Sequence, residues 1–289
     1  MHLSNYKQQT IPTQTLKEQL EILYQRNKIE LLQKLEERKL KELEFHNRDR
    51  DKNFTKQLSE DMYEKLHGNK KFYSTVQLSS DYVENWIKEK SKGKIFLDYA
   101  CGNGFNAIKA AKAGAELAIG IDLSDISIEN ARKASQDEST SDRTFFLQSD
   151  CENTGLPDNS IDVCLCSGML HHLDLSFAFY ELRRILKPGG IILAVEALDY
   201  NPIIKLYRIL TPQMRTDWEK AHILSYSDLV LAKRFFEVKE IKHWHLFSIA
   251  ASYVPALLPL FNFMDKLFLK LPLIKLMSWM FTFELHKRK

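Results

Sequence analysis

The chain has little of what marks specialised folds. It contains only 4 Cys, 10 Gly and 8 Pro among 289 residues. So little glycine and proline excludes collagen-like and low-complexity architectures. The few cysteines lack zinc-finger spacing, so buried, reduced thiols are expected. Residues 1–10 contain no apolar run, so no secretory signal is expected, and the cytoplasm is the predicted compartment.

Strong charge of one sign is also lacking. The chain carries 41 Lys+Arg against 38 Asp+Glu, a formal net charge of +3. Such a balance disfavours a nucleic-acid partner bound by electrostatics. The balance is a cancellation, because residues 72–200 are acidic overall and residues 201–289 are basic. The hydrophobic share of 44% is enough for a folded core.

Residues 1–71 are expected to form an N-terminal helical arm or lid. Between Thr13 and Phe45, leucines recur every three or four positions among Glu, Lys and Gln, without Gly or Pro. This pattern predicts one long amphipathic helix. Its apolar face could pack on its own domain, or it could pair with a second copy as a coiled-coil arm and form a homodimer.

After residue 93, short apolar runs alternate with helical patterns. Strands are predicted at residues 94–99, 117–121, 144–148, 161–166 and 191–196, and helices at 106–113, 125–133 and 176–186. This alternation predicts an α/β fold with a doubly wound parallel sheet. Ligands of such sheets bind beyond the carboxyl ends of the strands.

Acidic side chains stand at the ends of three successive predicted strands: Asp98, Asp122 and Asp150. A carboxylate at Asp122 could accept two hydrogen bonds from a ribose diol, and Asp150 with the N–H of Cys151 suits an adenine edge. The carboxylate that opens the turn at Asp98 would repel a pyrophosphate and attract a cation. The predicted cofactor therefore combines an adenosine with a cationic centre, as S-adenosylmethionine does.

Four segments resemble the class I S-adenosylmethionine-dependent methyltransferases, in the order and spacing of that family. They are LDYACGNG (97–104), GIDLS (120–124), QSDCENTGLPDNSIDVCLCSGMLHHL (148–173) and LRRILKPGGIILAVE (182–196). The resemblance implies a Rossmann-like sheet of seven strands, the last one antiparallel, with residues 236–242 and 279–286 as the sixth and seventh. It implies transfer of a methyl group from S-adenosylmethionine, and no metal is expected.

The resemblance also implies roles for individual residues. The cofactor would contact Asp98, Ala100, Gly102, Gly104, Asp122, Leu123, Asp150, Cys151 and Ser167. Ala100 stands where the family usually has glycine, and we expect binding to survive this small change. His171 and His172 follow the fourth strand and are the candidate general bases, with His172 preferred.

The predicted acceptor is an apolar small molecule or a lipid, methylated most simply on oxygen. Residues 72–289 would form the methyltransferase domain, with 197–235 and 246–276 as helical cap insertions over the acceptor. Candidate acceptor contacts are Arg215, His222, Phe45, His46 and Tyr73. The alternatives are an RNA or protein methyltransferase, or a peripheral-membrane enzyme acting on a prenylated or lipid acceptor.

Residues 246–264 contain no charged side chain, over a length that approaches a membrane span. Pro255 and Pro259 interrupt the segment, and a crossing would separate two strands of one sheet. It could instead be a cap over an apolar acceptor. The third interpretation is peripheral contact with a bilayer through residues 246–276, where lysines interleave with leucines.

Overall fold

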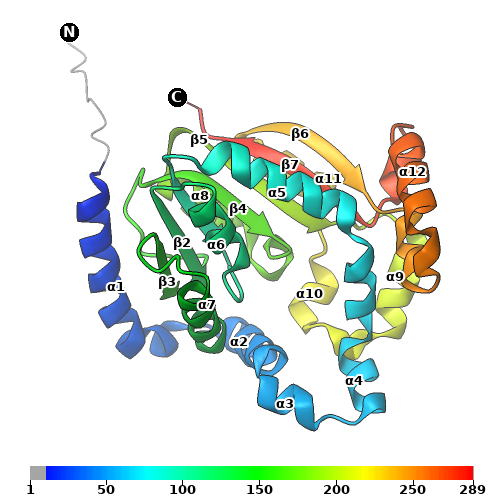
Figure 1. Ribbon diagram of the computed structural model, residues 1–289, viewed down its shortest axis with the longest axis horizontal. Coiled ribbons are helices and arrows are strands. Elements are labelled where there is room, and N and C mark those ends of the chain that lie inside the picture. The colour runs from blue at the N-terminus through cyan, green and yellow to red at the C-terminus, as the bar shows by residue number, and fades with distance from the viewer. Residues whose placement is uncertain (1–10, 289) are drawn as a thin grey trace.

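The computed structural model describes residues 11–288, so the predictions made for residues 1–10 lie outside the described part. Seven strands form one sheet in the order β3-β2-β1-β4-β5-β7-β6, with helices on both faces (Figure 1). The strands are β1 (Ile95–Tyr99), β2 (Leu117–Asp122), β3 (Thr144–Gln148), β4 (Ile161–Ser167), β5 (Leu186–Ala197), β6 (Glu237–Trp244) and β7 (Met280–His286). β7 runs antiparallel to both β5 and β6, whereas β1 to β5 are mutually parallel. The predicted seven-stranded, doubly wound fold is confirmed.

The two faces of the sheet bury separate apolar clusters. In β1, Leu97 and Tyr99 join one cluster and Phe96 joins the other, as the alternation of side chains along a strand requires. The first cluster is covered by α1 (Thr13–Lys34), α8 (Leu175–Ile185) and α11 (Tyr226–Ala232). The second is covered by α5 (Gln77–Ser91), α6 (Phe105–Lys112) and α7 (Asp125–Asp137). Burial on both faces explains why the strands read as continuous apolar runs.

The strand predicted at residues 191–196 begins earlier than expected. α8 ends at Ile185 and β5 starts at once with Leu186, so Lys187-Pro188-Gly189-Gly190 lies within an extended segment. Ile161 of β4 pairs with Leu186, and Val163 pairs with Ile191. The extra residues on β5 therefore form a bulge, which accommodates proline and two glycines without a separate turn.

The prediction of one long N-terminal helix was wrong. The helix is broken at Leu35 and Glu36, whose backbone is extended, and continues as α2 (Glu37–Arg50). α3 (Lys52–Gln57) and α4 (Glu60–His67) follow, and Figure 1 shows these helices as an arc that starts beside β3 and ends near α9 (Pro202–Leu210). The break lets the chain turn from the face of the sheet to the ends of its strands.

The apolar face of α1 is used within the chain. Leu16, Leu20 and Leu23 are buried in the first core cluster. Of the two alternatives left open by the leucine pattern, packing on its own domain accounts for these side chains.

The predicted cap regions divide between the sheet and its edge. α11 packs on α8 and β6, whereas α9 and α10 (Asp217–Ala221) lie beyond the strand ends. The apolar segment after β6 folds as short 3-10 helices η4 (Ser248–Ser252) and η5 (Pro255–Leu257) and as α12 (Leu258–Phe268). Within residues 11–288, no helix combines the length and apolar character needed to cross a membrane.

Truncation of Leu20 tests whether α1 belongs to the core. Leu20 is fully buried, whereas Ile22 on the same helix is exposed. Leu20→Ala should lower the free energy of unfolding by about 2–5 kcal/mol, because it leaves a cavity in the core. Ile22→Ala should change it by less than about 0.5 kcal/mol. Urea unfolding measures both, and equal effects would mean that α1 is not part of the folded core.

Candidate active site

The carboxyl ends of β1 to β4 border a cavity of about 120 Å³. Most of the predicted cofactor residues line it, namely Ala100, Asp122, Leu123, Asp150, Cys151 and Ser167, together with His46 and His172. Segments far apart in the sequence meet here because parallel strands share one carboxyl edge.

Asp122 is held rigidly at the end of β2. Its Oδ2 accepts a hydrogen bond from the N–H of Gly102 at 2.8 Å, and its Oδ1 accepts one from the N–H of Ser124 at 2.8 Å. Each carboxylate oxygen keeps further acceptor capacity. The side chain therefore presents two acceptors to the cavity, as a pair of adjacent hydroxyls would require.

Asp98 and Gly104 shape the turn after β1 and do not line the cavity. Asp98 is buried and accepts a hydrogen bond from the N–H of Ala107 at 3.2 Å, at the start of α6. Burial raises the pKa of Asp98 to about 7, although this hydrogen bond opposes the shift. A Cβ on Gly104 would lie 2.7 Å from the Cβ of Ala131 and 2.6 Å from Phe146. The absence of a side chain at Gly104 thus permits helix–sheet packing.

Ala100 occupies a left-handed backbone conformation, with φ at 58°. The related family usually has glycine at this position, and the observed φ supplies the physical reason. An L-residue with a Cβ is disfavoured in this region by about 1–2 kcal/mol. Ala100 lines the cavity as well, so its methyl group also narrows the space for a ligand.

Helix α2 closes the cavity with charged side chains that the sequence analysis did not identify, except for His46. They are Arg38, Lys39, Glu42 and Arg50. Lys39 Nζ lies 2.7 Å from Asp150 Oδ2, and Arg38 Nη2 contacts both carboxylate oxygens of Glu152 at 2.7 and 2.8 Å. Since residues 38, 42, 46 and 50 recur every four positions, they share one face of the helix. That spacing was the signal available in the sequence.

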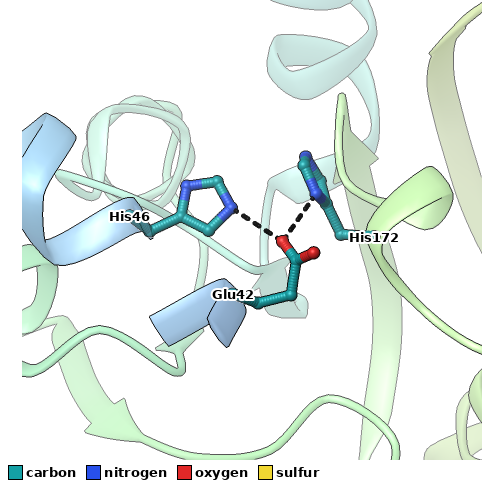
Figure 2. A group of neighbouring side chains, drawn as sticks. All are labelled: Glu42, His46 and His172. Carbon is teal, nitrogen blue, oxygen red and sulfur yellow. Dashed lines mark hydrogen bonds and ion pairs between the residues drawn. The ribbon is translucent and has the colours of Figure 1, made fainter. Parts of the chain in front are cut away.

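Glu42 lies between two imidazoles (Figure 2). Its Oε2 accepts a hydrogen bond from His172 Nδ1 at 3.0 Å and lies 3.6 Å from His46 Nε2, while Thr216 donates to its Oε1. Burial opposes ionisation, but the hydrogen bonds from His172 and His46 hold the pKa of Glu42 below its usual range. Burial, and then repulsion by His171, lower the pKa of His172 to about 3. Glu42 is therefore a carboxylate and His172 a neutral imidazole at pH 7.

The same three side chains could hold a divalent cation. Their donor atoms all lie within 4.8 Å of one another. A carboxylate with two imidazoles is a common ligand set for transition metals. The hydrogen bonds within the group also satisfy these atoms without an ion.

A second cavity of about 270 Å³ lies on the other side of the histidine pair. Aromatic and aliphatic side chains from α9, η4 and the segment before α5 form most of its wall, with Tyr73, Arg208, Arg215 and Glu219 as polar members. Tyr73 and Arg215 were predicted as acceptor contacts, whereas Arg208 was not. His222 and Phe45 do not line this cavity: the exposed His222 ring stacks on Trp218, and Phe45 packs edge-on against His46.

His171 and His172 separate the two cavities. Their ring centroids are 4.2 Å apart, but His171 lines the second cavity and His172 the first. His171 Nδ1 contacts Glu196 Oε2 at 2.7 Å, which leaves its Nε2 for the second cavity. Burial would lower the pKa of His171, but the charge and hydrogen bond of Glu196 outweigh burial and raise it above the ordinary value.

Glu196 was not predicted as a site residue, although it fixes this loop. It is fully buried at the end of β5, and its Oε1 accepts the N–H groups of Met169 and Leu170 at 2.9 and 2.8 Å. An acidic residue that closes a buried apolar strand was the only sign of it in the sequence.

Comparison with known proteins assigns part of the chain. Residues 97–194 match the family model described as methyltransferase domain. Ribosomal protein L11 methyltransferase of Burkholderia vietnamiensis is 33% identical over 118 residues, which are 41% of this chain and 36% of that protein. Sterol 24-C-methyltransferase of Aspergillus fumigatus is 31% identical over 121 residues, 42% of this chain and 32% of that protein. The chain thus spans about a third of the length of these relatives.

Solved structures share the fold over a larger part of the chain. Geranyl diphosphate C-methyltransferase from Streptomyces coelicolor A3(2) covers 74% of this chain and 80% of its own, with a TM-score of 0.53 and 14% identity. The [4+2]-cyclase SpnF covers 73% of this chain and 83% of its own, with a TM-score of 0.53 and 19% identity. Because a cyclase and a methyltransferase share this fold, the fold alone does not set the reaction.

Replacing Ala100 by glycine tests the strain in the turn. Ala100→Gly relieves the left-handed alanine but adds backbone freedom to the unfolded chain, so the free energy of unfolding should rise by about 0.5–1 kcal/mol. Ala134→Gly, inside α7, is the control and should lower it by about 1 kcal/mol or more. Urea unfolding measures both. Equal losses would show that position 100 does not strain the folded state.

Proposed function

We propose that the methyltransferase domain of residues 97–194 works as an S-adenosylmethionine-dependent methyltransferase whose acceptor is apolar and carries an anionic group. The observation that carries the proposal is the meeting of two cavities at His171 and His172, one bordered by strand-end carboxylates and the other largely apolar. A methyl donor and an acceptor held on the two sides would react by direct displacement, for which positioning supplies much of the rate.

The first cavity fits the parts of S-adenosylmethionine. Asp122 offers two acceptors for a ribose diol, and Asp150 with Cys151 offers a carboxylate and an N–H for the adenine edge. A Cβ on Gly102 would lie only 3.3 Å from the Arg50 guanidinium, so this cation stands beside the glycine turn, where it suits the carboxylate of the methionine moiety. The bound cofactor would supply an electrophilic methyl group.

The second cavity fits an acceptor with an apolar body and an anionic end. Its wall includes Phe72, Ile204 and Trp279. The two arginines on that wall have only loose acidic partners: Arg208 lies 3.4 Å from Asp199, and Arg215 lies 3.5 Å from Glu219. Buried cations that lack close partners favour an anionic ligand. The similarity to enzymes named for sterol and geranyl diphosphate substrates supports an apolar acceptor.

His171 is the better candidate for a general base if the acceptor is a hydroxyl, which reverses our preference for His172. His171 lines the acceptor cavity and is held by Glu196, whose charge raises its pKa. His172 lines the cofactor cavity and gives Nδ1 to Glu42. In this proposal His171 Nε2 takes the acceptor proton as the methyl group moves, and His172 positions α2.

Cofactor binding provides the first test. Titration calorimetry with S-adenosylmethionine should show binding by the wild type and about 10- to 100-fold weaker binding by Asp122→Asn, which loses charge-assisted hydrogen bonds to the diol. Asp137→Asn, on the exposed end of α7, should bind like the wild type. A wild-type protein that fails to bind S-adenosylmethionine would falsify the proposal.

The acceptor can be found with methyl-labelled cofactor and a panel of anionic lipids, soluble phenols, RNA and ribosomal proteins. Transfer to a lipid or to an apolar anion supports the proposed acceptor class. Transfer confined to RNA or protein would instead establish the alternative function.

The two histidines can then be separated by kinetics. His171→Asn should lower kcat about 10²- to 10⁴-fold with little change in cofactor affinity, since a positioned base contributes that much. His172→Asn should mainly weaken cofactor binding.

The pH profile gives an independent check. A base must be neutral, so the rate should fall as pH drops through the raised pKa of His171. Glu196→Gln removes the charge that raises this pKa, so the acid limb should move to lower pH. A limb that stays in place would assign the titration to another group.

A further inference from the structure

Helix α12 has its polar side chains inside and its apolar side chains outside. Asn262 and Asp265 are buried, and Asp265 is only 1% exposed. Leu260, Phe263 and Leu267 are exposed, Phe263 to 65%. They recur every three or four residues and so share one face of the helix. A helix on a water-exposed surface would show the opposite arrangement.

Specific hydrogen bonds hold α12 in this orientation. The Asp265 carboxylate accepts the N–H groups of Leu246 at 3.1 Å, Phe247 at 2.7 Å and Ser248 at 3.2 Å. A buried carboxylate is tolerated only when it is satisfied in this way. The outward face of α12 is thus fixed by the bonds on its inward face.

Helix α9 presents a second exposed apolar face. Ile203, Leu206 and Ile209 point away from the protein, and Ile209 is 72% exposed. Figure 1 shows α9 and α12 at the same end of the molecule. We call the exposed apolar side chains of α9, η5, α12 and residues 271–273 the apolar rim. Contiguous apolar surface of this kind marks an interaction site, whereas scattered apolar residues do not.

The acceptor cavity opens onto the apolar rim. Ile203 and Tyr253 both line the cavity, and both are among the exposed large apolar residues. A hydrophobic molecule could therefore pass between the rim and the cavity without crossing water.

The charges around the rim are positive. α9 contains Lys205 and Arg208 and no acidic residue. Lys266, Lys270 and Lys275 border α12, and the only acidic residue between 246 and 276 is the buried Asp265. A symmetric contact between two copies would bring these lysines together and be opposed by like charge. An anionic bilayer complements both the apolar side chains and the lysines.

We propose that the apolar rim docks on an anionic lipid bilayer and that the acceptor enters the cavity directly from it. The docking does not depend on the reaction, whereas the route of the acceptor rests on the proposed methyltransferase function.

Vesicle flotation without cofactor tests the docking. The full chain should float with vesicles of mixed phosphatidylcholine and phosphatidylglycerol and bind pure phosphatidylcholine vesicles much less. Phe263→Ser and Leu206→Ser should each weaken binding about tenfold, because a large apolar side chain is lost from the interface. Lys266→Gln and Lys270→Gln should each weaken it about fivefold, and only on anionic vesicles.

Phe177→Ser is the matched control. Phe177 lies on α8 and is 59% exposed, but it is not part of the rim, so its replacement should leave binding unchanged. The docking proposal is wrong if the wild type does not float, if Phe177→Ser weakens binding as much as Phe263→Ser, or if the rim forms a dimer that Phe263→Ser dissociates. Titration of S-adenosylmethionine without lipid is a separate measurement, so failure of docking and failure of the proposed function can be distinguished.

Discussion

A buried carboxylate at the end of β5 organises the centre of this protein. Glu196 accepts two backbone N–H groups from the loop after β4 and contacts His171, all within the interior. These bonds direct His171 to one cavity, and His172 then lies toward the other. There Glu42, from a helix that precedes the sheet by many residues, contacts His172. Two carboxylates thus assign adjacent histidines to different compartments, and the division into cofactor and acceptor sides depends on them.

The sequence was informative wherever local pattern and burial agree. Runs buried on both faces predicted β1 to β4 to within one or two residues, and the carboxylates at strand ends predicted much of the cofactor cavity. The break at Leu35 and Glu36 could not be foreseen, because neither residue disrupts a helix and no capping side chain is present. Its cause is tertiary: Arg38 reaches Glu152, and Lys39 reaches Asp150, more than 100 positions away.

The acceptor side was harder to predict for the same reason. His222 lies in a motif similar to that of related enzymes, but its ring stacks on Trp218 at the surface. Arg208 carries no motif and becomes part of the cavity only because α9 turns it inward. The orientation of α12 also depends on a distant contact, between Asp265 and the segment after β6. Side chains whose roles come from long-range pairing leave no periodic trace in one sequence.

The arc of N-terminal helices has a kinetic consequence. α2 is continuous with α1, which is packed into the core, and with α3 and α4, which reach the opposite side of the site. A lid anchored at both ends cannot swing away as a flap, so exchange of a ligand beneath it requires the middle to bow outward. That motion breaks the Arg38 and Lys39 ion pairs together and pulls Glu42 from His172 and Thr216. Turnover would then be limited by one cooperative opening that frees both compartments, and an intact lid would keep a reactive methyl donor away from water between cycles.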